Sequence, residues 1–446
     1  MDLTSLHALS AGDAARLVRD GLISSVELVE ACLARVRARD GEIQAWAFLD
    51  PEHALAQARA ADEWRLGGRP LGPLHGVPVG VKDIFDTSDM PTENGSVLHS
   101  GRTPSGDSTA VAMLRAAGAV IMGKTVTTEF ACGGPGKTRN PHHPAHTPGG
   151  SSSGSAAAVA AGMVPLALGS QTGGSTIRPA SYCGVFGFKP THGLIPRHGM
   201  FRISRTLDHV GLFARSIEDI ALLAEQLVGY DERDPDSRPR ARIPYASVAC
   251  EKPPLPPMFA FVKTPHWDRV DGDAKEAFGE LVDRLGDRVE ELELSGAALE
   301  AYEWHRVIME AELAANLERE WTRGRDRLSD LLHERIERGR ALPALDYLRA
   351  LERIPDLQDA FAQLFSQRYD AILTPASTGT APEGLASTGD RSFCTLWTLC
   401  GMPALSMPLM QGAKDLPLGV QLVGPAHGDG RLLRTARWLV SHLAGA

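Results

Sequence analysis

The chain has 446 residues, of which 43% are hydrophobic and 23% are charged, a composition typical of a soluble globular protein. Its formal net charge of −9 argues against nucleic acid as the main partner. The six cysteines form no C-x-x-C pair, the first residues lack a secretory pattern, and no apolar run is long enough to span a bilayer. We therefore expect a cytoplasmic protein without a membrane partner.

The first hundred residues predict helices followed by strands. Ser24 opens a capping box that closes on Glu27, and apolar residues then recur at helical spacing. Residues 45–50 predict a strand, and an alanine-rich helix follows from Pro51. Residues 76–85 are rich in β-branched side chains, which predicts a buried strand.

Strands and helices continue to alternate through the rest of the chain. We predict helices over residues 108–118, 155–164, 216–229 and 273–285, and strands over 119–122, 165–170, 183–190, 259–263, 370–375 and 416–424. This alternation predicts an α/β/α fold, in which helices cover both faces of a central mixed, mostly parallel sheet.

One proline- and charge-rich stretch interrupts the pattern. Residues 231–257 predict a surface connection. The alternation resumes beyond it, and the last strands can return to the same sheet, so we expect a single domain over residues 1–446. Acidic residues interrupt the arginines between 319 and 340, which predicts a solvated helix face.

Residues 118–125, GAVIMGKT, match the phosphate-binding pattern G-x-x-x-x-G-K-[ST]. A phosphate loop needs a strand before the first glycine and a helix that starts at the lysine. Here a helix precedes Gly118, a strand fills the space between the glycines, and β-branched residues follow Lys124. The match therefore does not predict a nucleotide triphosphatase.

Residues 150–154 match G-x-S-x-G, which in an α/β-hydrolase places the nucleophile, here Ser152, on a sharp turn between a strand and a helix. A helix does follow. The preceding residues 138–148 contain three prolines, however, and cannot form a central strand. A flexible linker is a second alternative, although the stretch runs directly into an apolar helix and is therefore expected to be buried.

Residues 169–181, GSQTGGSTIRPAS, follow an apolar strand. Glycine accepts backbone angles that other residues resist, so the residues 172–175 can turn consecutive N–H groups toward one point. Such a loop forms an oxyanion hole beside a hydroxyl nucleophile. On the local pattern alone, an ordinary Gly-Gly turn stays an alternative.

The histidines His142, His143 and His146 are residues of a type that binds metals. Their proline-rich surroundings favour a loop beside the site instead. We expect neither a metal nor an organic cofactor.

Taken together, residues 76–87 and 147–191 resemble the amidase signature family, and the likeness runs over most of the chain. The resemblance implies the fold of that family and a Ser-cisSer-Lys catalytic triad. Lys82 matches the lysine, Ser151 the bridging serine with the cis peptide bond, and Ser175 the nucleophile. The implied oxyanion hole consists of the backbone N–H groups of Thr172, Gly173, Gly174 and Ser175.

This triad requires an uncharged lysine. A serine hydroxyl is a weak nucleophile and needs an adjacent base, and a lysine is a base only when its pKa falls from about 10.4 toward ~7–8, as burial can cause. Alternation along the strand places Asp83 on the face opposite Lys82. Ser151 can both accept and donate a hydrogen bond, so it can pass a proton between Ser175 and Lys82.

The implied reaction is the hydrolysis of a small carboxylic amide by acyl transfer. Ser175 attacks the amide carbonyl, and the N–H groups of the loop hold the oxyanion. The relay protonates the leaving ammonia or amine, and water then releases the acid.

Two positions differ from a pattern that is common in the family. Many members have Asp where this chain has Gln171, and an Arg two residues after the nucleophile, whereas Arg178 stands three residues after it. This variant resembles free-standing, malonamidase-like enzymes, in which the matching arginine binds a substrate carboxylate. Arg178 is therefore a candidate substrate-binding residue, and a structural role beside Pro179 is an equal alternative.

Several functions stay open on the sequence. Residues 299–345 lie where the substrate pocket of the family varies most, and they indicate no particular substrate. A stand-alone amidase, either a monomer or a homodimer, is the first hypothesis. The alternatives are the A subunit of a glutamyl-tRNA amidotransferase, which supplies ammonia to a partner, an α/β-hydrolase that uses Ser152, and an inactive scaffold of the same fold.

Overall fold

The computed structural model describes residues 3–445, and its strands form one mixed sheet of eleven strands in the order β1-β3-β2-β4-β6-β5-β10-β11-β9-β7-β8. The strands are β1 (Trp46–Leu49), β2 (Pro78–Lys82), β3 (Val120–Thr125), β4 (Leu166–Gln171), β5 (Phe186–Lys189), β6 (His209–Ala214), β7 (Phe259–Val262), β8 (Val289–Leu292), β9 (Ala371–Pro375), β10 (Ala404–Gln411) and β11 (Pro417–Val423).

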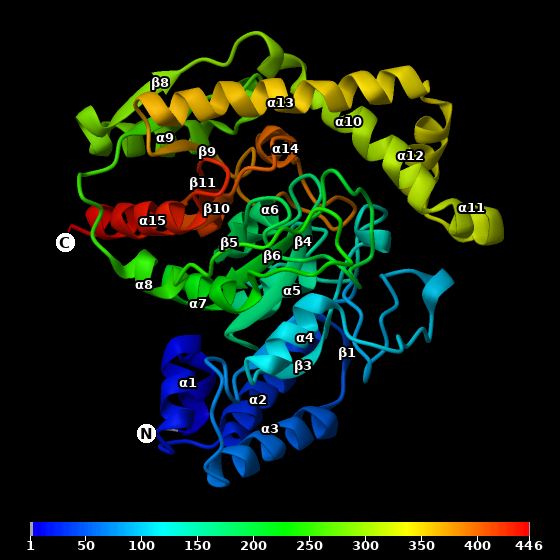
Figure 1. Ribbon diagram of the computed structural model, residues 1–446, viewed down its shortest axis with the longest axis vertical. Coiled ribbons are helices and arrows are strands. Elements are labelled where there is room, and N and C mark those ends of the chain that lie inside the picture. The colour runs from blue at the N-terminus through cyan, green and yellow to red at the C-terminus, as the bar shows by residue number, and fades with distance from the viewer. Residues whose placement is uncertain (1–2, 446) are drawn as a thin grey trace.

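Helices connect these strands and surround the sheet. They are α1 (Ala11–Arg19), α2 (Ser25–Ile43), α3 (Pro51–Leu66), α4 (Thr109–Ala116), α5 (Ser153–Ala160), α6 (Ile177–Cys183), α7 (Ile217–Leu227), α8 (Tyr245–Cys250), α9 (Gly272–Leu285), α10 (Ala297–Asn316), α11 (Glu318–Gly324), α12 (Asp330–Ala341), α13 (Ala344–Gln367), α14 (Ser392–Leu399) and α15 (Asp429–Leu443). Figure 1 shows α1, α2 and α3 at one end of the long axis of the molecule and α13 at the other.

The sheet is buried on both faces because its strands carry apolar side chains in both directions. In β3, Ile121 packs into one core with residues of α1, α4 and α7. Its neighbours Val120 and Met122 pack into a second core with residues of α2, α3 and α5. The predicted α/β/α layering is therefore confirmed.

The mixed sheet is confirmed, but its strands are not mostly parallel. Four strand pairings are parallel, those of β2 with β3 and β4 and of β7 with β8 and β9. The other six are antiparallel. For example, residues 412–416 join β10 to β11 and are too few for the crossover that a parallel pair needs. Alternation along the sequence does not fix the direction of strands that become neighbours out of sequence order.

The phosphate-loop match falls on strand residues. Strand β3 is longer than predicted and runs through Gly123 and Lys124. Lys124 is fully buried and forms an ion pair with Asp83, with 3.2 Å between Nζ and Oδ1. These residues therefore offer no loop or helix start to a phosphate group.

The structure also bears on several smaller predictions from the sequence. The capping box of Ser24 and Glu27 starts α2. Residues 238–244 of the proline-rich stretch are exposed. Residues 299–345 contain most of α10 and all of α11 and α12. The six cysteines are free, and no helix between residues 3 and 445 has the length and apolar character needed to cross a membrane.

The first turn of α5 packs closely against neighbouring backbone, which gives a test of the fold. A Cβ on Gly154 would lie 2.2 Å from the carbonyl oxygen of Ala45. We expect Gly154→Ala to lower the free energy of unfolding by about 3 kcal/mol, because this overlap with backbone cannot be relieved by a side-chain rotation. Chemical denaturation measures the change.

The matched control is Gly279→Ala in the exposed part of α9, where an added Cβ meets no atom within 4 Å. This variant should gain about 0.5–1 kcal/mol, since alanine favours a helix over glycine. Equal stability of the two variants would contradict the close packing of α5.

Candidate active site

The carboxyl ends of the parallel strands β2 and β4 bring three polar side chains together. Lys82 is the last residue of β2, and its Nζ lies 2.7 Å from Ser151 Oγ and 2.8 Å from Ser170 Oγ. Ser170 belongs to β4, and Ser151 lies two residues before α5. Ligands of α/β proteins bind at this edge of a sheet. The cluster therefore lies where a site is expected.

The backbone at Ser151 has the geometry that the family resemblance implies. The peptide bond between Gly150 and Ser151 is cis. The carbonyl oxygen of Gly150 accepts a hydrogen bond of 2.5 Å from Arg178 Nη2. The carbonyl oxygen of Ser151 accepts one of 3.3 Å from the backbone of Thr128. Both sides of this turn are thus held by neighbouring segments.

Lys82 lies in surroundings that favour its uncharged form. The side chain is completely buried, and burial lowers its pKa to about 7. Asp208 and Cys132 oppose the shift. As the sequence predicts, Asp83 lies on the other face, where it contacts Lys124. A large fraction of Lys82 is therefore neutral near pH 7.

A second buried lysine shows why the partners matter as much as the pKa. Burial also lowers the pKa of Lys189 to about 7. The Nζ of Lys189 donates to the carbonyl oxygen of Met402 and, at 3.4 Å, to that of Pro190. A carbonyl oxygen only accepts, whereas the serine hydroxyls around Lys82 can also donate. Of these two lysines, only Lys82 has partners that can exchange a proton with it.

The loop that follows β4 has its carbonyl groups occupied. The carbonyl oxygen of Thr172 accepts from His305 Nε2 at 2.8 Å. That of Gly173 accepts from Thr398 Oγ1 at 2.8 Å, and the next carbonyl accepts from the first turn of α6. Within residues 3–445, the backbone N–H groups of residues 173–175 have no hydrogen-bond acceptor. Three donors are thus free beside the Ser175 hydroxyl.

Gln171 fixes the loop to α6 and α14. Its Oε1 accepts hydrogen bonds of 2.9 and 3.0 Å from the backbone N–H groups of Thr176 and Ile177. Its Nε2 donates to Thr398 Oγ1 at 3.0 Å. The residue that departs from the common family pattern therefore positions the loop by hydrogen bonds alone and adds no charge to it.

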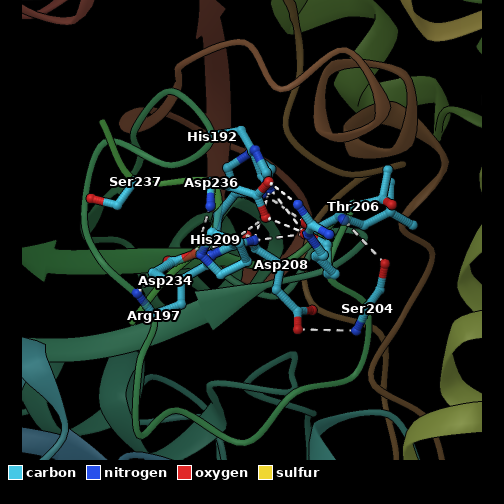
Figure 2. Close-up of polar contacts among 12 residues, drawn as sticks. His192, Arg197, Ser204, Thr206, Asp208, His209, Asp234, Asp236 and Ser237 are labelled. Atoms are coloured by element: carbon cyan, nitrogen blue, oxygen red, sulfur yellow. Dashed lines mark hydrogen bonds and ion pairs between the residues drawn. The ribbon is translucent and has the colours of Figure 1, made fainter. Parts of the chain in front are cut away.

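Asp208 holds the other end of the loop. Its carboxylate accepts from Thr172 Oγ1 at 2.6 Å and from the backbone N–H of Ser204 at 3.0 Å. Figure 2 shows the carboxylate pointing toward Ser204, while the backbone carbonyl oxygen of Asp208 accepts from Arg197 Nη1 at 3.1 Å, and Arg197 in turn contacts His192. Burial raises the pKa of Asp208 to about 6, and the Thr172 hydroxyl opposes that rise.

A cavity of about 250 Å³ opens above the cluster. Its lining includes Ser151, Ser175 and other residues of the loop after β4, together with Met309 of α10 and Leu331 of α12. The Ser175 side chain is partly exposed, and its hydroxyl makes no hydrogen bond to residues 3–445. A hydroxyl open to the cavity is free to meet a ligand. A larger cavity of about 690 Å³ near Phe201 contains none of these residues.

Ser152, the alternative nucleophile, is not available to a ligand. Its side chain is fully buried. Its hydroxyl donates to the carbonyl of Ser170 at 3.2 Å and accepts from the N–H of the same residue at 3.1 Å. No strand precedes it, since residues 138–150 are irregular. The α/β-hydrolase hypothesis is therefore wrong, because both hydrogen bonds of this hydroxyl hold the backbone of β4.

The histidines of the proline-rich segment contact backbone carbonyl groups. His142 Nε2 is 2.9 Å from the carbonyl oxygen of Cys183, and His146 Nδ1 is 2.7 Å from that of Ala381. In the part of the chain that the structure describes, no group of three or more His, Cys, Asp or Glu residues is placed to hold a metal ion.

Local sequence patterns do not point to several residues of the site. They indicate Ser170 only as the end of a strand, although its position after the apolar residues of β4 places it at the carboxyl edge. Asp208 and His305 lie far along the chain, and no local pattern marks them. The same holds for Arg391, which lines the cavity. Arg335 lies in the arginine-rich segment 319–340, for which the sequence predicts a solvated helix face, but its half-buried side chain lines the cavity instead.

Comparisons with known proteins show the family that this sequence matches. The sequence pattern of the Amidase family matches residues 27–433. The A subunit of the glutamyl-tRNA(Gln) amidotransferase of Chloroflexus aurantiacus is 35% identical, over 97% of this chain and 96% of that protein. Its counterpart from Streptomyces coelicolor is 34% identical, over 97% of this chain and 95% of that protein.

Solved structures of amide hydrolases have the same fold. The native peptide amidase from Stenotrophomonas maltophilia superimposes with a TM-score of 0.84 and 29% identity, over 98% of this chain and 97% of that one. The 6-aminohexanoate cyclic dimer hydrolase superimposes with a TM-score of 0.87 and 28% identity, over 99% and 98%.

Proposed function

The chain belongs to the amidase signature family of enzymes that hydrolyse carbon–nitrogen bonds, and from that premise we propose that it is a stand-alone amidase. In this proposal it converts a small carboxylic amide into an acid and ammonia or an amine. Ser175 is the nucleophile, Ser151 the bridging serine and Lys82 the base. The observation that carries the proposal is a fully buried Lys82 within 2.7 Å of the Ser151 hydroxyl.

The first step is the activation of Ser175. Neutral Lys82 takes a proton from Ser151, and Ser151 in turn takes the proton of Ser175 as its oxygen attacks the amide carbonyl. The Ser170 hydroxyl, 2.8 Å from the amine, holds Lys82 in line with Ser151. No carboxylate forms an ion pair with Lys82 among residues 3–445, so the amine can lose its proton at neutral pH.

The second step is stabilisation of the tetrahedral intermediate and loss of the amine. The free N–H groups of residues 173–175, together with that of Thr172, are the proposed oxyanion hole. Hydrogen bonds from His305 and Thr398 to the carbonyl oxygens of Thr172 and Gly173 hold this loop in place before the substrate binds. Protonated Lys82 returns its proton through Ser151 to the leaving nitrogen, and water then hydrolyses the acyl ester on Ser175.

The proposal fixes the pH dependence of the reaction. Because the pKa of Lys82 is lowered to about 7, the base is protonated and inactive below that pH and free above it. We expect kcat/KM to fall about tenfold per pH unit on the acid side and to level off above about pH 8. Initial rates of ammonia release between about pH 5 and 9 measure the profile. A limb centred near pH 10 instead would mean that Lys82 titrates as an exposed lysine.

The A subunit of a glutamyl-tRNA amidotransferase is the second candidate. It is favoured by the 35% identity to such subunits over 97% of this chain. The position of Arg178 argues against this candidate, because an arginine three residues after the nucleophile resembles the spacing in free-standing amidases. The two functions differ in whether the purified chain hydrolyses small amides without a partner protein.

An activity screen separates the two. The purified chain is assayed for ammonia release from aliphatic, aromatic, urea-like and carboxylated amides and from glutamine. Turnover of one or more small amides by the chain alone supports the stand-alone amidase. Activity confined to glutamine, and only when the chain is purified with a second protein, would replace it by the amidotransferase.

A further inference from the structure

A second cavity, of about 690 Å³, takes no part in the proposed reaction. Its lining comes from the loop between β2 and α4, from residues 199–201 and from residues 319–327. The loop is coloured cyan in Figure 1 and lies below α11 in that view. None of the described residues lines both this cavity and the one above Ser175. The volume is within the range of roughly 300–1,000 Å³ that is typical of small-molecule sites.

The loop and α11 are packed together at this cavity. His99 Nε2 lies 3.1 Å from Glu320 Oε1, and His99 Nδ1 lies 2.8 Å from Asn94 Nδ2. The Leu98 side chain packs directly over Gly324, where a Cβ would overlap it. These contacts fix the shape of the cavity before any ligand binds.

One part of the cavity is apolar. Met200 and Phe201 belong to its lining. The Phe201 ring packs against Phe130, with 5.1 Å between the ring centroids, and against His99 at 6.3 Å. Phe201 is only half-buried, so part of this residue remains accessible. The apolar body of a ligand can pack on it.

A buried amide in the lining keeps one oxygen without a donor. Asn94 is 2% exposed and lines the cavity. Its Nδ2 contacts His99, but its Oδ1 accepts no hydrogen bond from the described residues. Buried polar atoms normally have a partner. Asn94 therefore retains an acceptor for a hydroxyl or amino group at the wall of this cavity.

The lining has an excess of positive charge. It contains four arginines and two carboxylates, and both carboxylates already have a partner. Arg102 binds the two oxygens of Asp86 at 2.7 and 3.0 Å, and Glu320 contacts His99. The side chains of the other three arginines form no hydrogen bond and no ion pair with any residue between 3 and 445. They are Arg319, Arg323 and Arg327.

Arginines of the same segment that lie outside the two cavities do have acidic partners. Arg325 Nη2 lies 2.8 Å from Glu337 Oε1, and Arg340 is paired with Glu318. The two unpaired arginines of α11 are four residues apart, a spacing at which like charges repel each other. The chain thus places carboxylates beside the arginines that face away from the cavity and leaves the arginines that line it without any.

The arrangement of these arginines suits a phosphate group. A guanidinium group binds phosphate oxygens with two parallel hydrogen bonds. The terminal oxygens of a phosphate point in several directions, so guanidinium groups from different positions can bind it together, whereas a carboxylate offers two oxygens in one plane. The three arginines are exposed, so a solute can reach them. Their local charge also contrasts with the net charge of −9 of the whole chain, which repels anions.

We propose that the cavity near Phe201 is a second binding site, which takes a small organic phosphate. The phosphate group binds to the three unpaired arginines, and the apolar part of the ligand packs against Phe201 and Met200. Because this site shares no lining residue with the cavity above Ser175 in the described chain, the inference does not depend on the proposed amidase reaction.

The first test compares three probes by titration calorimetry. Phenyl phosphate carries both a phosphate group and an aromatic ring, whereas inorganic phosphate and phenol each carry one of the two. We expect phenyl phosphate to bind at least about 10-fold more tightly than either of the others. If phenyl phosphate does not bind, or if inorganic phosphate binds as tightly, the proposal is wrong.

The second test removes one contact at a time. Arg323→Gln should weaken the binding of phenyl phosphate about 10-fold or more, because a charged donor pair is lost. Phe201→Leu should weaken phenyl phosphate about 3-fold or more and leave inorganic phosphate unchanged, because only the ring contact is lost.

The matched control is Arg325→Gln, which removes an exposed arginine of the same segment that does not line the cavity. It should bind phenyl phosphate as the unaltered protein does. Unchanged binding in Arg323→Gln, or an equal loss in Arg325→Gln, would overturn the proposal.

The variant Arg391→Met tests where the probe binds, because Arg391 lines the cavity above Ser175. It should keep the affinity for phenyl phosphate. Loss of binding in Arg391→Met, together with normal binding in Arg323→Gln, would place the probe above Ser175 and refute the second site.

Arg323→Gln also separates this inference from the proposed function. Without phosphate in the assay, it should hydrolyse a cleaved amide with the kcat and KM of the unaltered protein. A protein that cleaves no amide and still binds phenyl phosphate through Arg323 would refute the amidase and support the second site. Normal hydrolysis without any binding of phenyl phosphate would do the reverse.

Discussion

Ser175→Ala should lower kcat/KM for a cleaved amide by about 10⁴-fold or more while the protein stays folded. Removal of a nucleophile leaves only the rate that binding and the oxyanion donors provide. Stability should change little, because the Ser175 hydroxyl is partly exposed and makes no hydrogen bond to residues 3–445. Steady-state kinetics and chemical denaturation on the same preparation measure both quantities.

Ser152→Ala is the control with the opposite pattern. The Ser152 hydroxyl makes two hydrogen bonds to the backbone of Ser170, so its loss should lower the free energy of unfolding by about 1–3 kcal/mol. Its kcat should stay within about tenfold of that of the unaltered enzyme. If Ser152→Ala lost the chemistry and Ser175→Ala kept it, the assignment of the nucleophile would be reversed.

Lys82→Met should lower kcat/KM by about 10³-fold or more and remove the acid limb of the pH profile. Methionine keeps the length of the side chain without the amine, so the variant is expected to fold, since it no longer buries a polar nitrogen. The residual activity should not depend on pH near 7, because the group that titrates there is gone. The measurement is kcat/KM between about pH 5 and 9.

The structure provides a matched control in Lys189→Met. Lys189 is as fully buried as Lys82, and its pKa is also lowered to about 7, but its partners are carbonyl groups outside the cavity lining. We expect this variant to keep the acid limb near pH 7 and activity within about tenfold of the unaltered level. Loss of the acid limb in Lys189→Met, together with its retention in Lys82→Met, would show that Lys189 and not Lys82 is the base.

Much of the fold follows from local patterns. The capping box at Ser24 predicts the start of α2, and the apolar runs predict β2 and β4, whose ends carry site residues. These elements can be predicted because each is specified by its own residues. The face of the sheet to which Lys82 points also follows from alternation in one strand. The balance of parallel and antiparallel pairs could not be predicted, since strands such as β5 and β10 pair across a long stretch of intervening chain.

The candidate site likewise contains some residues that the sequence predicts and others that only the folded structure reveals. Lys82, Ser151 and Ser175 lie in short segments whose residues match a family pattern, so their positions could be expected. Ser170 required the observation that β2 and β4 are neighbours. The arginines at positions 335 and 391 come from α12 and the start of α14, and only the folded chain brings them over Ser175.

The most direct test of a nucleophile activated by a buried lysine is to locate a covalent adduct. The protein is treated with a fluorophosphonate at about pH 8, where the lysine is neutral, and digested, and mass spectrometry identifies the modified peptide. We predict an adduct on Ser175 that forms at least about 100-fold more slowly in Lys82→Met. An adduct on another serine, or labelling of Ser175 at the same rate without Lys82, would contradict it.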